Sequence, residues 1–317
     1  MASYNVYLDS NNYSHGYDLF NEHIPSGTAF AARPDELCIS LDEEKNISYN
    51  IVISNLTNNT ITPLDKQIIG LIASFGYVTT KQLSEMLALL GCDKPADKLL
   101  NNTERLRRLG VIRAFSFGRS RDEKCCMQVF TLCKNGSEIA KATCVNHSYN
   151  IMNAAAYPSD VKRVLARNQG VLAFLKSELP LDWFRINTVI SSSDISDAAV
   201  RPSFTVSVEN EVIMYEVVRR GQFWENQLRN KLSRYKLLFD NFESNSWDMT
   251  CFPTLVMVGE TFEHSRMINE IAREIGIKVL FSDDLMFCGK NFYSSVYGFE
   301  NGTQQFYLFE SRPRIEE

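Results

Sequence analysis

The sequence lacks a long apolar run, and this absence excludes a membrane-spanning helix. No hydrophobic stretch approaches the roughly 18 to 20 residues that are needed to cross a bilayer. The first residues also lack the basic lead and apolar core of a secretion signal. We therefore expect a cytoplasmic protein with no membrane partner.

Motifs for metal binding and for common kinds of catalysis are missing as well. The eight cysteines form no CxxC pair and are accompanied by only four histidines, so a structural zinc site is not expected. The sequence contains no GxxxxGK[ST], GxGxxG, GxSxG or HExxH motif, which argues against nucleotide-binding loops, serine hydrolases and zinc proteases. We expect reduced thiols and no cofactor.

The chain is long enough for more than one domain, and its charge is unevenly distributed. With 317 residues, two or more compact units are expected. The net charge is −5, but residues 1–59 carry −6, residues 60–147 carry +5 and residues 148–317 carry −4. The middle segment is a basic island, and a local basic patch attracts phosphate whatever the total charge.

Residues 1–60 form the least regular part of the sequence. They are rich in Asn, Ser, Asp and Glu and show no helical period. Three short runs, Tyr4–Leu8, Leu37–Leu41 and Tyr49–Ser54, predict β-strands, and the segment before Pro63 is typical of a linker. We expect an N-terminal arm or a small β-rich subdomain.

Three helices are predicted in the basic island. The first begins at Pro63, and the second is capped by Thr79, with Gln82 three residues later in a capping box. The third is predicted from about Ala96 to Leu109. At 100° per residue its Asn101, Arg105 and Arg108 share one face, and Leu99, Leu106 and Leu109 share the other. One side of this helix can therefore pack while the other is free to contact a groove.

A β-hairpin with a mostly basic tip is predicted after the third helix. Its strands are expected over Val111–Phe117 and Met127–Leu132, and a short helix follows. Three helices and such a hairpin predict a winged-helix domain over residues 61–146, whose third helix enters the major groove of duplex DNA. The open alternatives are a solvated helix face and a protein-interaction module. The predicted DNA-contacting residues are Thr80, Lys81, Lys98, Asn101, Arg105, Arg108, Arg113, Arg119, Arg121 and Lys124.

A second domain is predicted over residues 158–317, after a linker at 147–157. The predicted elements are a helix from Pro158, strands over 184–191, 204–208 and 212–218, a helix over 223–239, a strand over 254–258, a helix over 261–275 and a strand over 278–281. This order predicts a mixed central sheet flanked by helices. A further hairpin is expected around Asn301-Gly302. The predicted fold class is α+β or α/β.

Short motifs of this domain resemble those of the restriction-endonuclease-like fold. Arg201-Pro202-Ser203 precedes one strand, Tyr215–Gly221 (YEVVRRG) ends the next, and Lys231–Tyr235 (KLSRY) lies on the following helix. Together with the winged helix, these motifs look like the bacterial replication-relaxation family, which occurs on plasmids and other mobile elements. The resemblance covers about Pro63 to Asp283.

The resemblance implies a DNA-binding protein that acts in, or regulates, the replication or mobilisation of a plasmid or transposon. Its expected partners are double-stranded DNA and a relaxase or replication protein, and its arrangement would allow a homodimer. A scaffold that contacts a relaxase or replication initiator without touching DNA is the alternative from the class of interaction proteins.

The chain departs from the nuclease pattern at the metal-binding positions. An active site of this fold needs two carboxylates for Mg²⁺ and a Lys two residues after the second. Ser203, Glu216 and Val218 occupy these three positions, so we predict a domain that does not cleave DNA. In this interpretation Glu216 is paired with arginine 219 or 220 or with Lys231, because an unpaired buried charge is costly.

The alternative is a metal-dependent DNA nuclease. It requires that Asp194 or Asp197 supplies the missing carboxylate for Mg²⁺. It also requires that Lys231, from the following helix, replaces the missing Lys, so that the catalytic residues would be these acids with Glu216 and Lys231.

Overall fold

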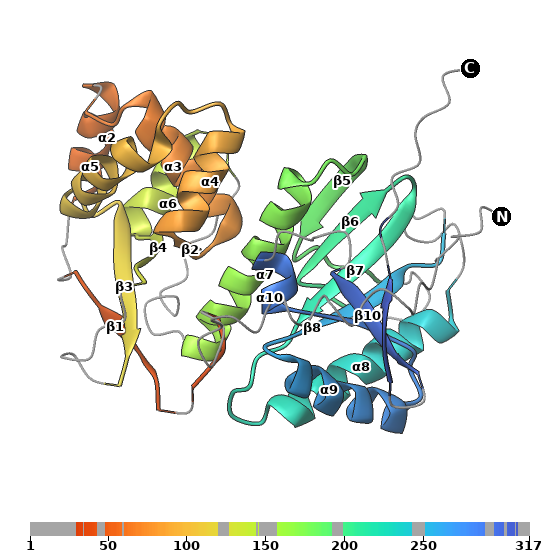
Figure 1. The fold of residues 1–317 in the computed structure, drawn as a ribbon. Coiled ribbons are helices and arrows are strands. Elements are labelled where there is room, and N and C mark those ends of the chain that lie inside the picture. Colours follow the sequence, from red (N-terminus) through yellow and green to blue (C-terminus); the bar gives the residue numbers. More distant parts are fainter. Residues whose placement is uncertain are drawn as a thin grey trace, which may run out of the picture. The chain divides into compact units, whose positions relative to one another are not determined.

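The chain folds into two compact units that together form a mixed α+β structure (Figure 1). The first unit is 33–168, and the second comprises the chain from Gln169 onward with residues up to Ala32. The computed structural model describes residues 30–33, 35–42, 48–58, 60–119, 127–143, 145, 157–191, 199–242, 251–288, 295–300, 303–307 and 309. None of the described helices is long and apolar enough to cross a membrane.

The first unit consists of helices packed against a four-stranded antiparallel sheet in the order β1-β3-β4-β2. Buried apolar side chains, among them Ile68, Leu83, Leu106 and Val129, form its core. Its elements are β1 (Leu37–Ser40), α2 (Tyr49–Thr57), α3 (Pro63–Phe75), β2 (Val78–Thr79), α4 (Thr80–Leu89), α5 (Pro95–Arg108), β3 (Ile112–Gly118), β4 (Val129–Leu132) and α6 (Lys134–Ala142).

Local signals place the first two helices of the basic island. Thr62 caps α3 in a capping box with Asp65, and Thr79 caps α4 in the predicted box with Gln82. Gly76 follows α3 with a φ of 80°, a conformation that glycine adopts without steric cost. The predicted starts of both helices are therefore confirmed.

The N-terminal prediction is correct for one strand and wrong for another. The run from Leu37 forms β1, which pairs with β3, so the predicted arm contributes to the sheet of the first unit. The run Tyr49–Ser54 is the start of helix α2, not a strand. Its Tyr, Ile and Val favour strands only weakly, and helix α2 contacts α6. The third run, Tyr4–Leu8, lies outside the described residues.

The second unit is built on a seven-stranded sheet in the order β11-β10-β9-β8-β7-β6-β5. Strands β5 to β7 are antiparallel neighbours, β7 to β9 are parallel, and β9 to β11 are antiparallel. Its strands are β5 (Leu181–Ile186), β6 (Phe204–Val208), β7 (Glu211–Val217), β8 (Thr254–Gly259), β9 (Leu280–Asp283), β10 (Val296–Glu300) and β11 (Thr303–Tyr307).

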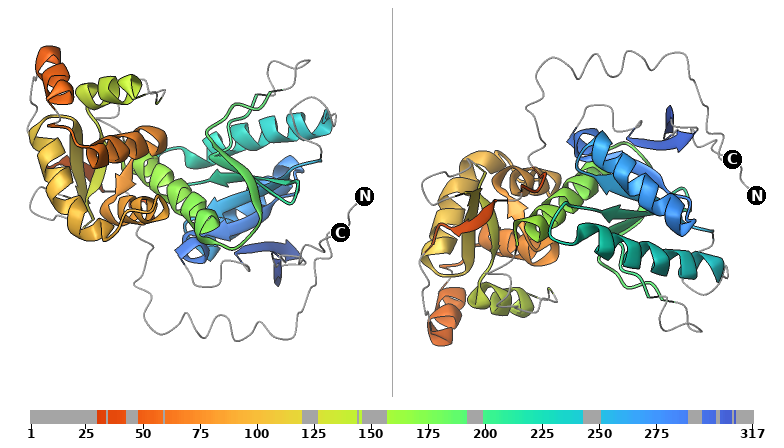
Figure 2. Two further views of the ribbon diagram at one scale, coloured as in Figure 1. Left: turned by 90° about the horizontal axis from the view of Figure 1, so that it is seen from above. Right: turned by 90° about the horizontal axis from the view of Figure 1, so that it is seen from below.

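Helices α8 (Trp224–Asp240) and α9 (Phe262–Ile275) lie side by side against the sheet (Figure 2). Their residues Leu232, Tyr235 and Ile268 share a buried cluster with Met214 and Met257 of the strands. The order of helices and strands predicted from the sequence is observed. The predicted strand over 184–191 is displaced and begins at residue 181, and a five-residue helix, α10 (Asp284–Cys288), follows β9.

A separate aromatic group packs against the strands from helix α7 (Pro158–Lys176). Phe174 of this helix contacts Phe204 and Tyr215, whose rings stack at 4.5 Å. A Cβ atom at Gly170 would lie 2.7 Å from the ring of Phe204, so this position needs glycine. Helix α7 runs through the boundary of the two units. The predicted linker residues 147–156 lie outside the described residues.

Candidate functional site

Helix α5 presents one polar surface and buries the other. Its Leu99, Thr103 and Leu106 are buried, whereas Lys98 and Asn101 are exposed. The helix contacts α4 and β3. The predicted burial of Leu99 and Leu106 and the predicted exposure of Asn101 are thus observed, and they follow from the spacing of these residues.

Arg105 does not belong to the free surface in the way that the projection suggested. Its guanidinium forms an ion pair with the buried Asp65 and donates to the side chain of Asn102 at 2.7 Å. It also lies 3.4 Å from Thr62 Oγ1. Arg105 therefore ties α5 to the capping box of α3 and contributes to the fold of this unit.

The remaining predicted contact residues differ in exposure. Arg108 is exposed and pairs with Glu104 one helical turn earlier, and Arg113 is half-buried on β3. Thr80, Lys81 and Arg119 are exposed. Arg121 and Lys124, at the tip of the predicted wing, lie outside the described residues.

Glu216 is the centre of a buried polar group in the second unit. Its Oε1 accepts a hydrogen bond from Ser203 Oγ at 3.1 Å, and its Oε2 accepts one from Tyr235 at 3.1 Å. Lys231 Nζ lies 2.6 Å from the same Oε2. The backbone N–H of Val217 donates to Ser203 Oγ at 3.0 Å. The structure thus brings together three of the residues that the sequence singled out.

Of the three cations predicted as partners of Glu216, the structure selects Lys231. Burial, followed by the nearby charge of Glu216 and the hydrogen bond to it, raises the pKa of Tyr235 well above its ordinary value. Tyr235 therefore keeps its proton and donates. Val218, which stands where the nuclease pattern has Lys, is buried and apolar.

The two arginines after β7 pair with carboxylates at the ends of neighbouring strands. Arg219 forms a buried ion pair with Asp284, directly after β9, and donates to the carbonyl of Val218 at 2.7 Å. Arg220 Nε donates to Glu260, directly after β8, at 2.7 Å. The carboxyl ends of three adjacent parallel strands are thereby cross-linked.

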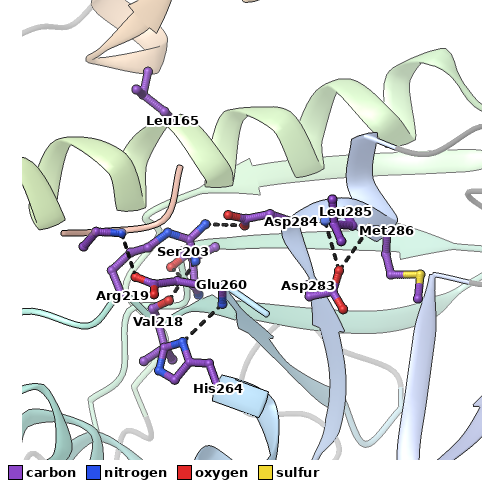
Figure 3. Close-up of polar contacts among 12 residues, drawn as sticks. Leu165, Ser203, Val218, Arg219, Glu260, His264, Asp283, Asp284, Leu285 and Met286 are labelled. Carbon is purple, nitrogen blue, oxygen red and sulfur yellow. Dashed lines mark hydrogen bonds and ion pairs between the residues drawn. The ribbon is translucent and has the colours of Figure 1, made fainter. Parts of the chain in front are cut away.

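Glu260 is fully buried and joins several segments (Figure 3). Its Oε1 accepts from the backbone N–H of Ala32 at 3.0 Å and from that of Arg220 at 2.9 Å. Its own N–H donates to Nδ1 of His264 at 3.1 Å, which assigns the proton of the neutral ring to Nε2. The ring lies perpendicular to that of Trp224, with centroids 4.7 Å apart.

Burial dominates the acid–base properties of this edge. It lowers the pKa of His264 from 6.5 to about 4, an effect that Glu260 opposes and the two arginines reinforce. It also raises the pKa of Asp283 from 3.8 to about 6, although Asp283 Oδ1 accepts the N–H groups of Leu285 at 2.9 Å and Met286 at 3.1 Å. The imidazole is therefore neutral near pH 7.

The sequence interpretation missed this second group, although a signal for it existed. Glu260 and Asp283 each stand two residues after a predicted strand, over 254–258 and 278–281, and Asp284 comes next. In an open sheet the carboxyl ends of parallel strands meet at one edge, where functional side chains tend to gather. These carboxylates are brought together because β7, β8 and β9 are adjacent and parallel, and the sequence alone does not give this arrangement.

Within the described part of the chain, no three His, Cys, Asp or Glu residues are placed to hold a metal ion. Asp194 and Asp197, which the nuclease interpretation requires, lie outside that part. Cys38, Cys92, Cys133 and Cys251 are not joined in disulfide bonds.

No protein-family model, curated protein or solved structure matches this chain. Its resemblance to the replication-relaxation family stays a prediction from the motifs and their order. The geometry of the two units is therefore the basis for the function proposed below.

Proposed function

We propose that this chain binds duplex DNA through its first unit, which we interpret as a winged helix. The exposed polar surface of α5, with Lys98 and Asn101 at its centre, is the observation that supports this function. Strand β3, which α5 contacts, ends at Gly118, and Arg119 begins the basic loop of the sequence. A helix of this kind fits the major groove, and flanking cations hold the phosphates.

The second unit supports a role without cleavage. Its order of helices and strands is the one expected for the nuclease-like fold, and Lys231, Tyr235 and Ser203 satisfy the carboxylate of Glu216. We interpret this unit as a nuclease-like domain that supplies a surface for a relaxase, a replication protein or a second copy. Replication or mobilisation of a mobile element is the corresponding process.

Fluorescence anisotropy with a labelled random-sequence duplex tests DNA binding. Replacing Lys81 and Lys98 by Ala should weaken binding about tenfold, since each contact with a phosphate contributes to affinity. The matched control replaces two lysines of α6, Lys134 and Lys141, and should change affinity less than about twofold. Absence of binding by the unchanged protein at low salt, or equal losses in both variants, would overturn the proposal.

A metal-dependent nuclease is the second candidate, because Glu216, Lys231 and Ser203 meet at one place. Magnesium would need a second carboxylate there, and Asp194 and Asp197 are the acids that the sequence offers. The decisive assay is nicking of supercoiled plasmid with Mg²⁺ or Mn²⁺. Nicking that disappears in Glu216→Gln would establish the enzyme, whereas an intact plasmid supports binding alone.

A further inference from the structure

The exposed surface of α5 contains an apolar residue where solvent would favour a polar one. Leu100 is 69% exposed, the highest value among the large aliphatic side chains of the described residues. Asn101 beside it is also exposed. Successive residues of a helix are 100° apart, so the side chains of Leu100 and Asn101 lie on adjacent parts of the helix surface and point in different directions.

The charges around this pair largely compensate one another. Arg108 pairs with Glu104, and Lys98 follows Asp97 on the same exposed part of the helix. The middle of α5 is therefore close to neutral, and the exposed cations Lys81 and Arg119 lie on other elements. Such an arrangement suits base edges at the centre and phosphates at the periphery.

The chemistry of Leu100 and Asn101 matches an A·T base pair. In the major groove, adenine presents the N7 acceptor and the N6 donor, which a carboxamide contacts with two hydrogen bonds. Thymine presents a C5 methyl group, which accepts apolar contact. A guanine would call for a cation at this position. Arg105, one turn after Asn101, is held by Asp65, and Lys98, one turn before it, is assigned above to the phosphates.

We propose that Leu100 and Asn101 determine base specificity and that the DNA site of this protein carries A·T pairs opposite them. This inference rests on the proposed DNA binding and names its ligand class. Asn101 contacts adenine, and Leu100 packs against the thymine methyl group of the same or a neighbouring pair.

The test first isolates the duplexes that the full-length protein selects from a random-sequence pool. Each selected duplex is then prepared with thymine or with uracil, so that the two forms differ only in the methyl groups. The unchanged protein should bind the thymine form roughly fivefold more tightly, and Leu100→Ala should bind both forms alike. Leu100 is exposed, so this variant should fold, which circular dichroism checks.

A second pair of duplexes tests Asn101. Replacing adenine by 7-deazaadenine removes the N7 acceptor, and this should weaken binding of the unchanged protein but not of Asn101→Ala. Selected sequences without enriched A·T pairs would overturn the inference while DNA binding stands. The inference would also be overturned if Leu100→Ala kept the preference for thymine. It would be overturned as well if this variant lost affinity equally for both forms, which is expected if Leu100 docks a protein instead of a base. Absence of any DNA binding would instead overturn the proposed function.

Discussion

Glu216 shows how much a single residue depends on its neighbours. Its side chain is 3% exposed, and a buried carboxylate without partners is too costly to retain. Ser203, directly before β6, supplies one donor, and Lys231 and Tyr235 of α8 supply two more. These contacts hold α8 against the carboxyl end of β7.

Lys231→Met should lower the free energy of unfolding by about 2 kcal/mol, because it leaves a buried carboxylate without its cation. The loss is smaller than for a fully buried pair because the Lys231 side chain is 31% exposed. Urea denaturation measures it. The matched control is Lys236→Met on the same helix, whose partner Asp240 is exposed, and it should cost less than about 0.5 kcal/mol. An equal loss of free energy of unfolding in both variants would show that the buried ion pair contributes no more to stability than the exposed one.

His264 and Asp283 make opposite contributions to the pH dependence of stability. The unfolded chain protonates His264 below pH 6.5, whereas the folded chain does so only near pH 4, so stability is lost as pH falls through this range. The unfolded chain ionises Asp283 above pH 3.8, whereas the folded chain retains its proton to about pH 6, so stability is lost as pH rises through that range. Between pH 4 and 6 the two contributions largely cancel.

Asp283→Asn should remove the contribution of Asp283 to the pH dependence and leave that of His264. Relative to the unchanged protein, its free energy of unfolding should rise between pH 4 and 6 by on the order of 2 to 3 kcal/mol. His264→Gln should show the reverse trend, with a relative free energy of unfolding that falls as pH rises from 4 to 6.5. Denaturant titrations at several pH values measure both. Differences that do not change with pH would contradict the assignment.

Helices α3 and α6 each contain a glycine, and the two positions differ in whether they have room for a larger side chain. A Cβ atom on Gly70 of α3 would meet only Val145, at 3.7 Å. A Cβ atom on Gly136 of α6 would lie 2.2 Å from the carbonyl oxygen of Val111. The first position is an ordinary helical site, whereas the second allows close contact between α6 and the start of β3.

Gly70→Ala should therefore stabilise the first unit by about 0.5 to 1 kcal/mol, because alanine favours the helix. Gly136→Ala should destabilise it by about 2 to 3 kcal/mol, because the helix must shift away from the strand. Thermal unfolding of both variants provides the comparison, and each serves as the control for the other. A shift of the same sign in both would contradict the packing described for α6.

At the scale of the whole molecule, a net charge of −5 opposes nucleic acid while residues 60–147 carry +5. DNA binding by such a chain depends on local cations, and these release counterions from the phosphates. We expect four of the exposed cations of the first unit to contact phosphates, namely Lys81, Lys98, Arg108 and Arg119.

The slope of log affinity against log salt concentration should be about −3 to −4, which corresponds to about four neutralised phosphates. Replacing Lys81 and Arg119 by Ala should make this slope about two units less negative. Binding titrations at several salt concentrations measure it, with the Lys134 and Lys141 variant as control. A slope near zero would show that the basic island does not contact phosphate.

The sequence by itself determined the elements whose causes are local. Capping boxes such as Thr79 with Gln82 join residues three positions apart, and the leucines of α5 recur within one or two turns. Positive φ angles at Glu209 and Asn210 form the turn between β6 and β7. These interactions form within a single segment, so the order of elements could be predicted.

Only the tertiary structure decided which charged residues meet. Arg105 finds Asp65 at a separation of 40 positions, and Arg219 finds Asp284 at 65. The helical projection placed Arg105 on the free surface. Such a projection gives the direction in which a side chain leaves its helix, but it does not show which other element lies in that direction. Burial selects such partners, since a charge removed from water must be paired, and burial depends on how strands β7 to β9 and helices α3 and α5 pack.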